Sequence, residues 1–246
     1  MALESSWVRH HMKVYLINLD KDKERFTAAD VQLKRLGVAY ERVSAVYAKE
    51  LPKEELDAAV NRFRWWCAIG RPVMVGEIGC AMSHYSIYRQ MTEPTCVLED
   101  DVVLDDRFPE VLDFVERKID VTRPQVILLS NHTRRIPNPP NLPNIQTSKS
   151  DMYAEGYVLT PLAAQALLKA NWPMQTPCDH WGRWAKRGLI ELYHAFPTVC
   201  RQDQSQYGSG TVDPNCFNVA NLSPARFALH KFKRLLGKII DIMLPL

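Results

Sequence analysis

The sequence lacks the motifs of the commonest nucleotide-binding and hydrolytic proteins. It contains no GxGxxG turn, no P-loop and no GxSxG elbow, which removes the main support for a dinucleotide-binding protein, an NTPase or a serine hydrolase. No run approaches the roughly 20 apolar residues that span a bilayer. Residues 1–11 also lack the continuous apolar stretch of a signal peptide. We therefore expect residues 1–11 to be a tag or a disordered leader, with Met12 as the natural start.

The cysteines and charges exclude further classes. The six cysteines show no CxxC pair and no zinc-like spacing. Several fall in apolar runs, which predicts small buried hydrophobic side chains and a reducing compartment. The six are Cys67, Cys80, Cys96, Cys178, Cys200 and Cys216. The formal net charge is +3. All of the basic excess lies in residues 225–246, so the rest of the chain is close to neutral and nucleic acid is not an expected partner.

One short segment concentrates negative charge. Residues 95–98 form an apolar run of strand-forming type and lead directly into Glu99, Asp100 and Asp101. In open α/β sheets, ligands bind beyond the carboxyl ends of the strands, and carboxylate oxygens suit Mg²⁺ or Mn²⁺. The segment therefore predicts a cation that bridges Asp101 to a diphosphate. The alternative is that the three acids only begin a solvated loop.

The hydrophobic pattern predicts an α/β protein. Strand patterns alternate with amphipathic helix patterns, which is typical of a mostly parallel sheet with helices on both faces. The expected strands are 13–19, 40–46, 95–98, 125–130, 152–160 and 189–195, and the expected helices are 21–36, 52–64, 76–91, 109–119 and 162–169. Asp20 is a candidate cap for the first helix. The proline-rich stretch 131–151 is expected to be a loop that borders the substrate cleft.

Several of these segments together carry a family resemblance. They are Asn18 and Arg25, Gly76 to His84 (GEIGCAMSH), Leu98 to Asp101 (LEDD), Gly156 to Leu159, Pro177 to Asp179 and Pro197 to Gln202. In this order they resemble glycosyltransferase family 25, which includes bacterial lipooligosaccharide galactosyltransferases and collagen galactosyltransferases. The resemblance runs from about residue 12 to residue 209. It implies a GT-A-like fold and the transfer of a hexose, typically galactose from UDP-galactose, with inversion, onto a lipooligosaccharide or lipopolysaccharide acceptor.

The resemblance also implies residue roles. The acidic triplet looks like the DxD motif of that fold and would bind Mn²⁺ or Mg²⁺, with Asp101 as the favoured metal ligand and Glu99 as a ribose contact or second metal contact. Asp100 would belong to the same UDP-sugar site, whose lining would include Asn18, Arg25, Ser83 and His84.

The acceptor hydroxyl needs a base when it attacks, and a carboxylate is the usual choice. We nominate Asp179, with His180 as the second candidate. Asp179 would alternatively cap the helix that begins near Trp181. His194 is a candidate late metal contact, and the alternative is a histidine that faces the core.

We expect three regions: the leader 1–11, a glycosyltransferase domain 12–222, and a basic amphipathic tail 223–246. The tail pattern predicts a helix on an anionic membrane surface, which would place the protein at the inner face of a bacterial cytoplasmic membrane, near a glycolipid acceptor. Packing of this helix on the body or on a second subunit is the alternative.

Two other functions stay open at this point. A glycoside hydrolase would also use paired carboxylates, but without metal or nucleotide. A non-catalytic, sugar-binding member would keep the fold and lose turnover of the donor.

Overall fold

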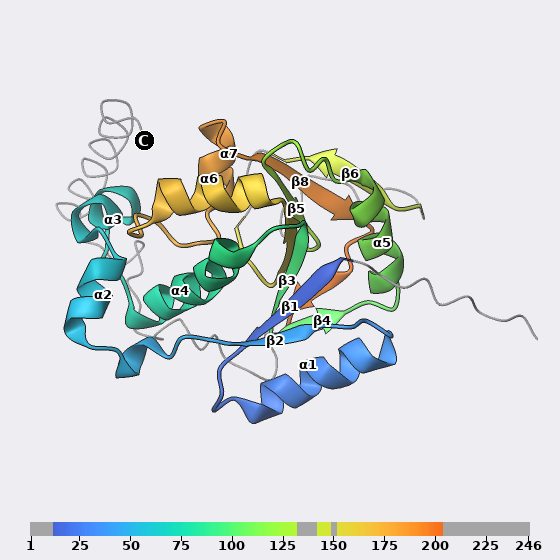
Figure 1. Cartoon of the computed structure of the whole chain (residues 1–246), viewed down its shortest axis with the longest axis horizontal. Coiled ribbons are helices and arrows are strands. Elements are labelled where there is room, and N and C mark those ends of the chain that lie inside the picture. Colours follow the sequence, from blue (N-terminus) through green and yellow to red (C-terminus); the bar gives the residue numbers. More distant parts are fainter. Residues whose placement is uncertain (1–11, 132–141, 149–151, 204–246) are drawn as a thin grey trace, which may run out of the picture.

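A seven-stranded sheet forms the centre of the computed structural model, which describes residues 12–131, 142–148 and 152–203 (Figure 1). Its strand order is β2-β1-β3-β7-β5-β8-β6. The strands are β1 (Lys13–Asn18), β2 (Glu41–Ser44), β3 (Thr95–Glu99), β5 (Gln125–Leu128), β6 (Asn144–Thr147), β7 (Gly156–Leu159) and β8 (Glu191–Phe196). Strands β4 (Val102–Leu104) and β9 (Cys200–Gln202) form a separate two-stranded sheet, the β4–β9 ribbon.

Most strands of the sheet point the same way. Strand β1 pairs in parallel with β2 and β3, and β5 pairs in parallel with β8. Strand β7 is antiparallel to both β3 and β5, and β6 is antiparallel to β8. Strands β1, β2, β3, β5 and β8 therefore share one direction, which confirms the predicted mostly parallel sheet.

Helices cover both faces of this sheet. Alternate residues of β3 enter two different cores: Val97 packs in the core beneath α4 and α6, whereas Leu98 packs in the core beneath α1 and α5. Figure 1 shows α4 and α6 running together on one side of the sheet. The helices are α1 (Lys23–Arg35), α2 (Lys53–Ala59), α3 (Arg62–Ile69), α4 (Val75–Gln90), α5 (Phe108–Lys118), α6 (Pro161–Asn171) and α7 (Trp181–Lys186), with a 3-10 turn η1 (Ala48–Glu50). The predicted α/β class is confirmed.

Local sequence signals explain where two of these helices begin. The Thr160 hydroxyl accepts the N–H of Ala163 at 3.3 Å, and Pro161 opens α6, where no backbone donor is needed. The Glu77 carboxylate accepts the N–H of Met74 at 2.9 Å at the start of α4. Arg71 pairs with the same carboxylate at 2.8 Å. Glu77 of the GEIGC segment therefore stabilises the start of α4.

The prediction of a single helix over 52–64 is wrong. Val60 is extended, with φ −136° and ψ 131°, and it bridges to Met174. The Asn61 side chain then accepts the N–H of Arg64 at 3.0 Å and starts α3. A buried β-branched residue followed by a good cap therefore divides the pattern into α2 and α3.

Asp20 does not cap α1, because that helix begins two residues further on, after Asp22. The Asp20 carboxylate instead accepts from Arg42 at 2.6 Å and from Ser44 at 2.8 Å. It therefore ties the end of β1 to β2.

The stretch 131–151 is not entirely a loop. Residues 144–147 form β6, which pairs with β8 at the edge of the sheet furthest from β2. This strand lies away from the carboxyl ends of β1 and β3, so the described part of the stretch does not border the cavity described below. The ranges 132–141 and 149–151 lie outside the described residues.

Two expected regions also lie outside the described residues, namely the leader 1–11 and the tail 223–246. Among the described helices, none has both the length and the apolar character needed to cross a bilayer.

Candidate active site

A cavity of about 660 Å³ opens where β1 and β3 end. These strands are adjacent and parallel, with Ile17 opposite Glu99, so the residues that follow them meet at one edge of the sheet. The remaining walls come from the start of α1, the segment 45–49 after β2, and α4. The structure brings together in this lining seven of the residues named from the sequence: Asn18, Arg25, Ser83, His84, Glu99, Asp100 and Asp101.

Asp100 is held on both of its oxygens. The Asn18 amide donates to Oδ2 at 2.7 Å, and the Arg25 guanidinium lies 3.2 Å from Oδ1. Asn18 is itself oriented, because its Oδ1 accepts from Arg42 at 2.8 Å. Burial raises the pKa of Asp100, while Asn18 and Arg25 act in the opposite direction. Asp100 therefore organises the site and has little capacity left for a ligand.

Asp101 differs from its neighbour in having an unused oxygen. Its Oδ2 accepts from the Gln202 amide at 2.9 Å and lies 3.9 Å from the Arg25 guanidinium. Its Oδ1 is buried and has no hydrogen-bond partner among the described residues. A buried carboxylate oxygen without a partner is costly, and a bound hard cation would satisfy it. Of the three acids, Asp101 therefore has the oxygen most suited to a divalent metal, and its role as metal ligand stays a prediction.

Glu99 belongs to a buried hydrogen-bond network. Its Oε1 lies 3.1 Å from Nε2 of His84, and Nδ1 of His84 lies 2.7 Å from the Tyr157 hydroxyl. Tyr157 is in turn 2.7 Å from the Tyr88 hydroxyl. Burial by itself lowers the pKa of His84, but Cys80 and the Glu99 carboxylate raise it above its ordinary value. The network directs Oε1 of Glu99 toward α4.

The GEIGC segment positions a wall of the cavity. Ser83 Oγ accepts the N–H of Val46 at 2.8 Å and donates to the carbonyl of Gly79 at 2.7 Å. A Cβ at Gly79 would lie 2.6 Å from the carbonyl oxygen of Val46. Only glycine permits this close approach of backbones. Ser83 and Gly79 therefore hold the segment 45–49 against α4.

The proposed bases lie beside the cavity and outside its lining. Cys178 Sγ is 3.7 Å from Sγ of Cys80, a lining residue, and Asp179 follows Cys178. Asp179 Oδ2 accepts the N–H of Tyr153 at 3.0 Å. Helix α7 has His180 at its N-cap, with no side-chain capping bond, so the capping alternative for Asp179 is wrong. Burial lowers the pKa of His180, with Asp179 opposing the shift.

His194 is not brought to the acidic residues. It lies on β8, which is separated from β3 by β7 and β5, and its side chain is fully buried. Its Nδ1 is 2.9 Å from the carbonyl oxygen of Ser130. This placement matches the core-facing alternative, and it gives no support to a metal contact by His194 in this site.

Most of the sequence matches the model of one protein family. Residues 11–181 match the family model described as Glycosyltransferase family 25 (LPS biosynthesis protein). The chain belongs to glycosyltransferase family 25.

The chain aligns with only part of each curated relative. Procollagen galactosyltransferase 2 of Homo sapiens is 28% identical over 173 residues, which cover 65% of this chain and 28% of that protein. A glycosyltransferase 25 family member of Anopheles gambiae is 35% identical over 96 residues, which cover 36% of this chain and 16% of that protein. The family 25 chain thus spans less than a third of the length of these relatives.

A solved structure, the inositol-1-phosphate CTP transferase from T. maritima, aligns with 92% of this chain and 97% of its own at 13% identity, with a TM-score of 0.40. So distant a likeness carries no functional argument.

Some lining residues of this family 25 chain were not identified from the sequence. They include Lys21, Tyr47, Lys49 and Gln202. Only Gln202 had a signal, as the last residue of a family segment. Cys80 and Cys178 were not named as site residues from the sequence, yet they lie together beside His84. The spacing Cys80-x-x-x-His84, which places two ligand types on one helix face, was the available signal.

Proposed function

We propose that this family 25 chain is a metal-dependent, inverting glycosyltransferase that transfers galactose from UDP-galactose to a lipooligosaccharide or lipopolysaccharide acceptor. The observation that carries the proposal is the buried, unpartnered Oδ1 of Asp101 in a cavity at the strand ends. The family supports sugar transfer, and the relatives named as galactosyltransferases support galactose.

The charge of the cavity favours a metal-dependent donor. Its carboxylates are Asp22, Glu24, Glu99, Asp100 and Asp101, against the basic side chains Lys21, Lys23, Arg25 and Lys49. A diphosphate would meet a lining in which carboxylates offset the basic groups. A divalent cation on Asp101, with Glu99 as a second contact, would add the positive charge that a diphosphate needs. When bound, it would supply Lewis-acid stabilisation of the departing diphosphate.

The chain's own residues would complete the reaction. Arg25, held between Asp100 and Asp101, would keep both carboxylates in place beside the donor phosphates. Lys21 lies over the ring of Tyr47 at 4.0 Å, which places an ammonium group at the wall where a nucleotide would enter. Asp179 would accept the proton of the acceptor hydroxyl as this attacks the anomeric carbon, with His180 as the second candidate.

Thermal shift with UDP tests the proposal directly. We expect UDP together with Mn²⁺ to raise the melting temperature, because a ligand at 100 times its Kd stabilises the folded state by about 2.7 kcal/mol. UDP without metal should have little effect. No metal-dependent shift would contradict the proposal and favour the glycoside hydrolase. A shift without turnover of any sugar in a panel of UDP-sugars would indicate a non-catalytic, sugar-binding member.

The acceptor proposal rests on sequence alone, since residues 223–246 lie outside the described part of the chain. Their five basic side chains and apolar positions support peripheral binding at the inner face of a bacterial cytoplasmic membrane. Deletion of 223–246 should weaken sedimentation with anionic liposomes at least about tenfold, because each basic residue near such a surface contributes roughly 1 kcal/mol. Neutral liposomes serve as the control, and unchanged anionic binding would contradict the membrane role.

A further inference from the structure

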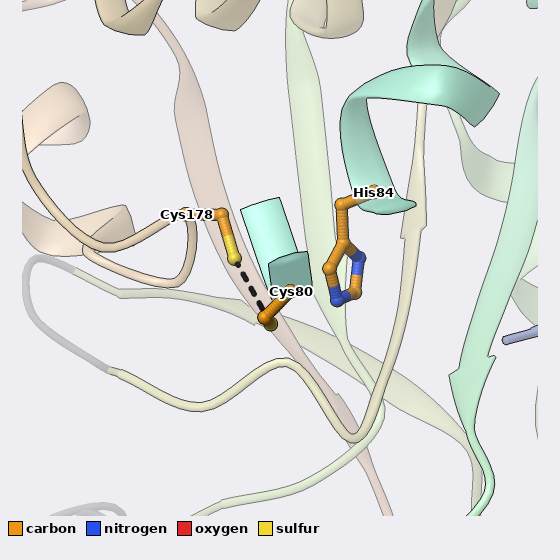
Figure 2. Close-up of side chains that lie close together, drawn as sticks. All are labelled: Cys80, His84 and Cys178. Carbon is orange, nitrogen blue, oxygen red and sulfur yellow. Dashed lines mark hydrogen bonds between the residues drawn. The ribbon is translucent and has the colours of Figure 1, made fainter. Parts of the chain in front are cut away.

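Two cysteines and a histidine converge beside the cavity. Cys80 and His84 lie one turn apart on α4, and Cys178 lies in the loop before α7 (Figure 2). One ligand atom from each residue lies within 4.8 Å of the others. All three residues are at least partly buried, although Cys178 is 98 positions from Cys80. The fold thus assembles two sulfur ligands and one nitrogen ligand from distant parts of the sequence.

The spacing of the two sulfur atoms suits a shared tetrahedral metal ion. The sulfur atoms of Cys80 and Cys178 are 3.7 Å apart. Two thiolates bound to one tetrahedral Zn²⁺ at about 2.3 Å each would be separated by about 3.8 Å. Thiolate and imidazole ligands select zinc over Mg²⁺ or Mn²⁺, which prefer oxygen. The cluster therefore differs in chemistry from the oxygen site at Asp101.

The surroundings supply a fourth ligand and an orienting partner. Oε1 of Glu99 lies 4.0 Å from Cys80 Sγ and 3.1 Å from His84 Nε2. The other nitrogen of His84 is 2.7 Å from the Tyr157 hydroxyl, and metal-bound histidines usually have such a partner on their second nitrogen. Three protein ligands with a carboxylate beside them complete a four-coordinate set.

We propose that Cys80, His84, Cys178 and Glu99 form a Zn²⁺ site in the wall of the cavity. The ion would join α4 to the loop before α7. Because Asp179 follows Cys178, the same ion would fix the position of that carboxylate relative to the cavity. Glu99 would connect the zinc site to the acidic triplet that it begins. This site does not depend on the proposed sugar transfer.

Metal titration of the reduced, chelator-treated full chain tests the site. Excess Mg²⁺ is included to fill oxygen sites without competing for thiolates. We expect Co²⁺ to give a thiolate-to-cobalt charge-transfer band, Zn²⁺ to displace it, and native mass spectrometry to show one zinc bound per chain. Zinc should also raise the melting temperature, since only the folded chain brings the ligands together.

Matched cysteine variants locate the ion. Cys178→Ala should weaken zinc binding at least about 100-fold, because it removes a ligand. Cys67→Ala and Cys96→Ala, which alter buried cysteines on α3 and β3, should bind as the unmodified chain does. The proposal is overturned if the unmodified reduced chain gives no charge-transfer band, or if Cys178→Ala gives the same band. Formation of a Cys80–Cys178 disulfide in a chain that takes up no zinc when reduced would also overturn it.

Discussion

Replacing Asp101 by asparagine is expected to remove the Mn²⁺-dependent thermal shift with UDP and to reduce sugar transfer at least about 100-fold. The affected atom is Oδ1, which is buried without a hydrogen-bond partner in the described structure. An amide of the same shape can still accept from Gln202, but it is a much weaker metal ligand. The free energy of unfolding of the metal-free chain should change by less than about 1 kcal/mol, because no existing contact is lost apart from the longer approach of Arg25.

Asp106→Asn is the matched control. Asp106 follows β4, the strand that begins directly after Asp101, but its side chain is 79% exposed and pairs with Arg35. This variant should keep the metal-dependent shift and the transfer rate. If Asp101→Asn bound UDP with Mn²⁺ as tightly as the unmodified chain, the cation would have to be held elsewhere. The metal role of the acidic triplet would then be wrong.

Asp179→Asn is expected to lower transfer by about 10²- to 10⁴-fold while leaving the thermal shift with UDP and Mn²⁺ unchanged. The amide retains an oxygen for the N–H of Tyr153, so the loop should keep its conformation. What it loses is the capacity to accept a proton from the acceptor hydroxyl. Initial rates with UDP-galactose and a sugar acceptor measure the first effect, and the thermal shift measures the second.

His180→Asn distinguishes the two candidates for the base. His180 is adjacent in sequence and begins α7, so the variant tests the same loop. A modest loss for His180→Asn together with a large loss for Asp179→Asn would support the carboxylate. Near-normal turnover of Asp179→Asn would refute the assignment, and a large loss for His180→Asn alone would move the role to the histidine.

The part of the site built on local order could be predicted. A buried strand that ends in carboxylates, next to a parallel first strand, places Asn18 and Asp100 at one edge whatever the details of packing. The helix pattern of α4 likewise brings Ser83 and His84 to the same region. The alternation of strands and helices predicted the acidic strand end, whereas the family resemblance assigned Asn18, Ser83 and His84 to the site.

The rest depended on contacts between distant residues. Cys178 reaches Cys80 only because the loop before α7 packs on α4, and no pattern around either cysteine reports this. Strands β4 and β9 have three residues each, too few for a period to be visible. The break at Val60 also comes from its bridge to Met174. Tertiary packing decided each of these features.

The pairing of β4 with β9 determines how much of the chain is needed to hold Asp101 in place. The family match ends at residue 181, but β8 and Gln202 follow it, and Gln202 supplies the amide that orients Asp101. The N–H of Asp203 also donates to the Asp101 carbonyl at 2.7 Å. During synthesis, the contacts that hold Asp101 therefore cannot all form until residue 203 has emerged. A fragment that ends at residue 181 would lack the inner strand β8 and the contacts of Gln202 and Asp203 with Asp101.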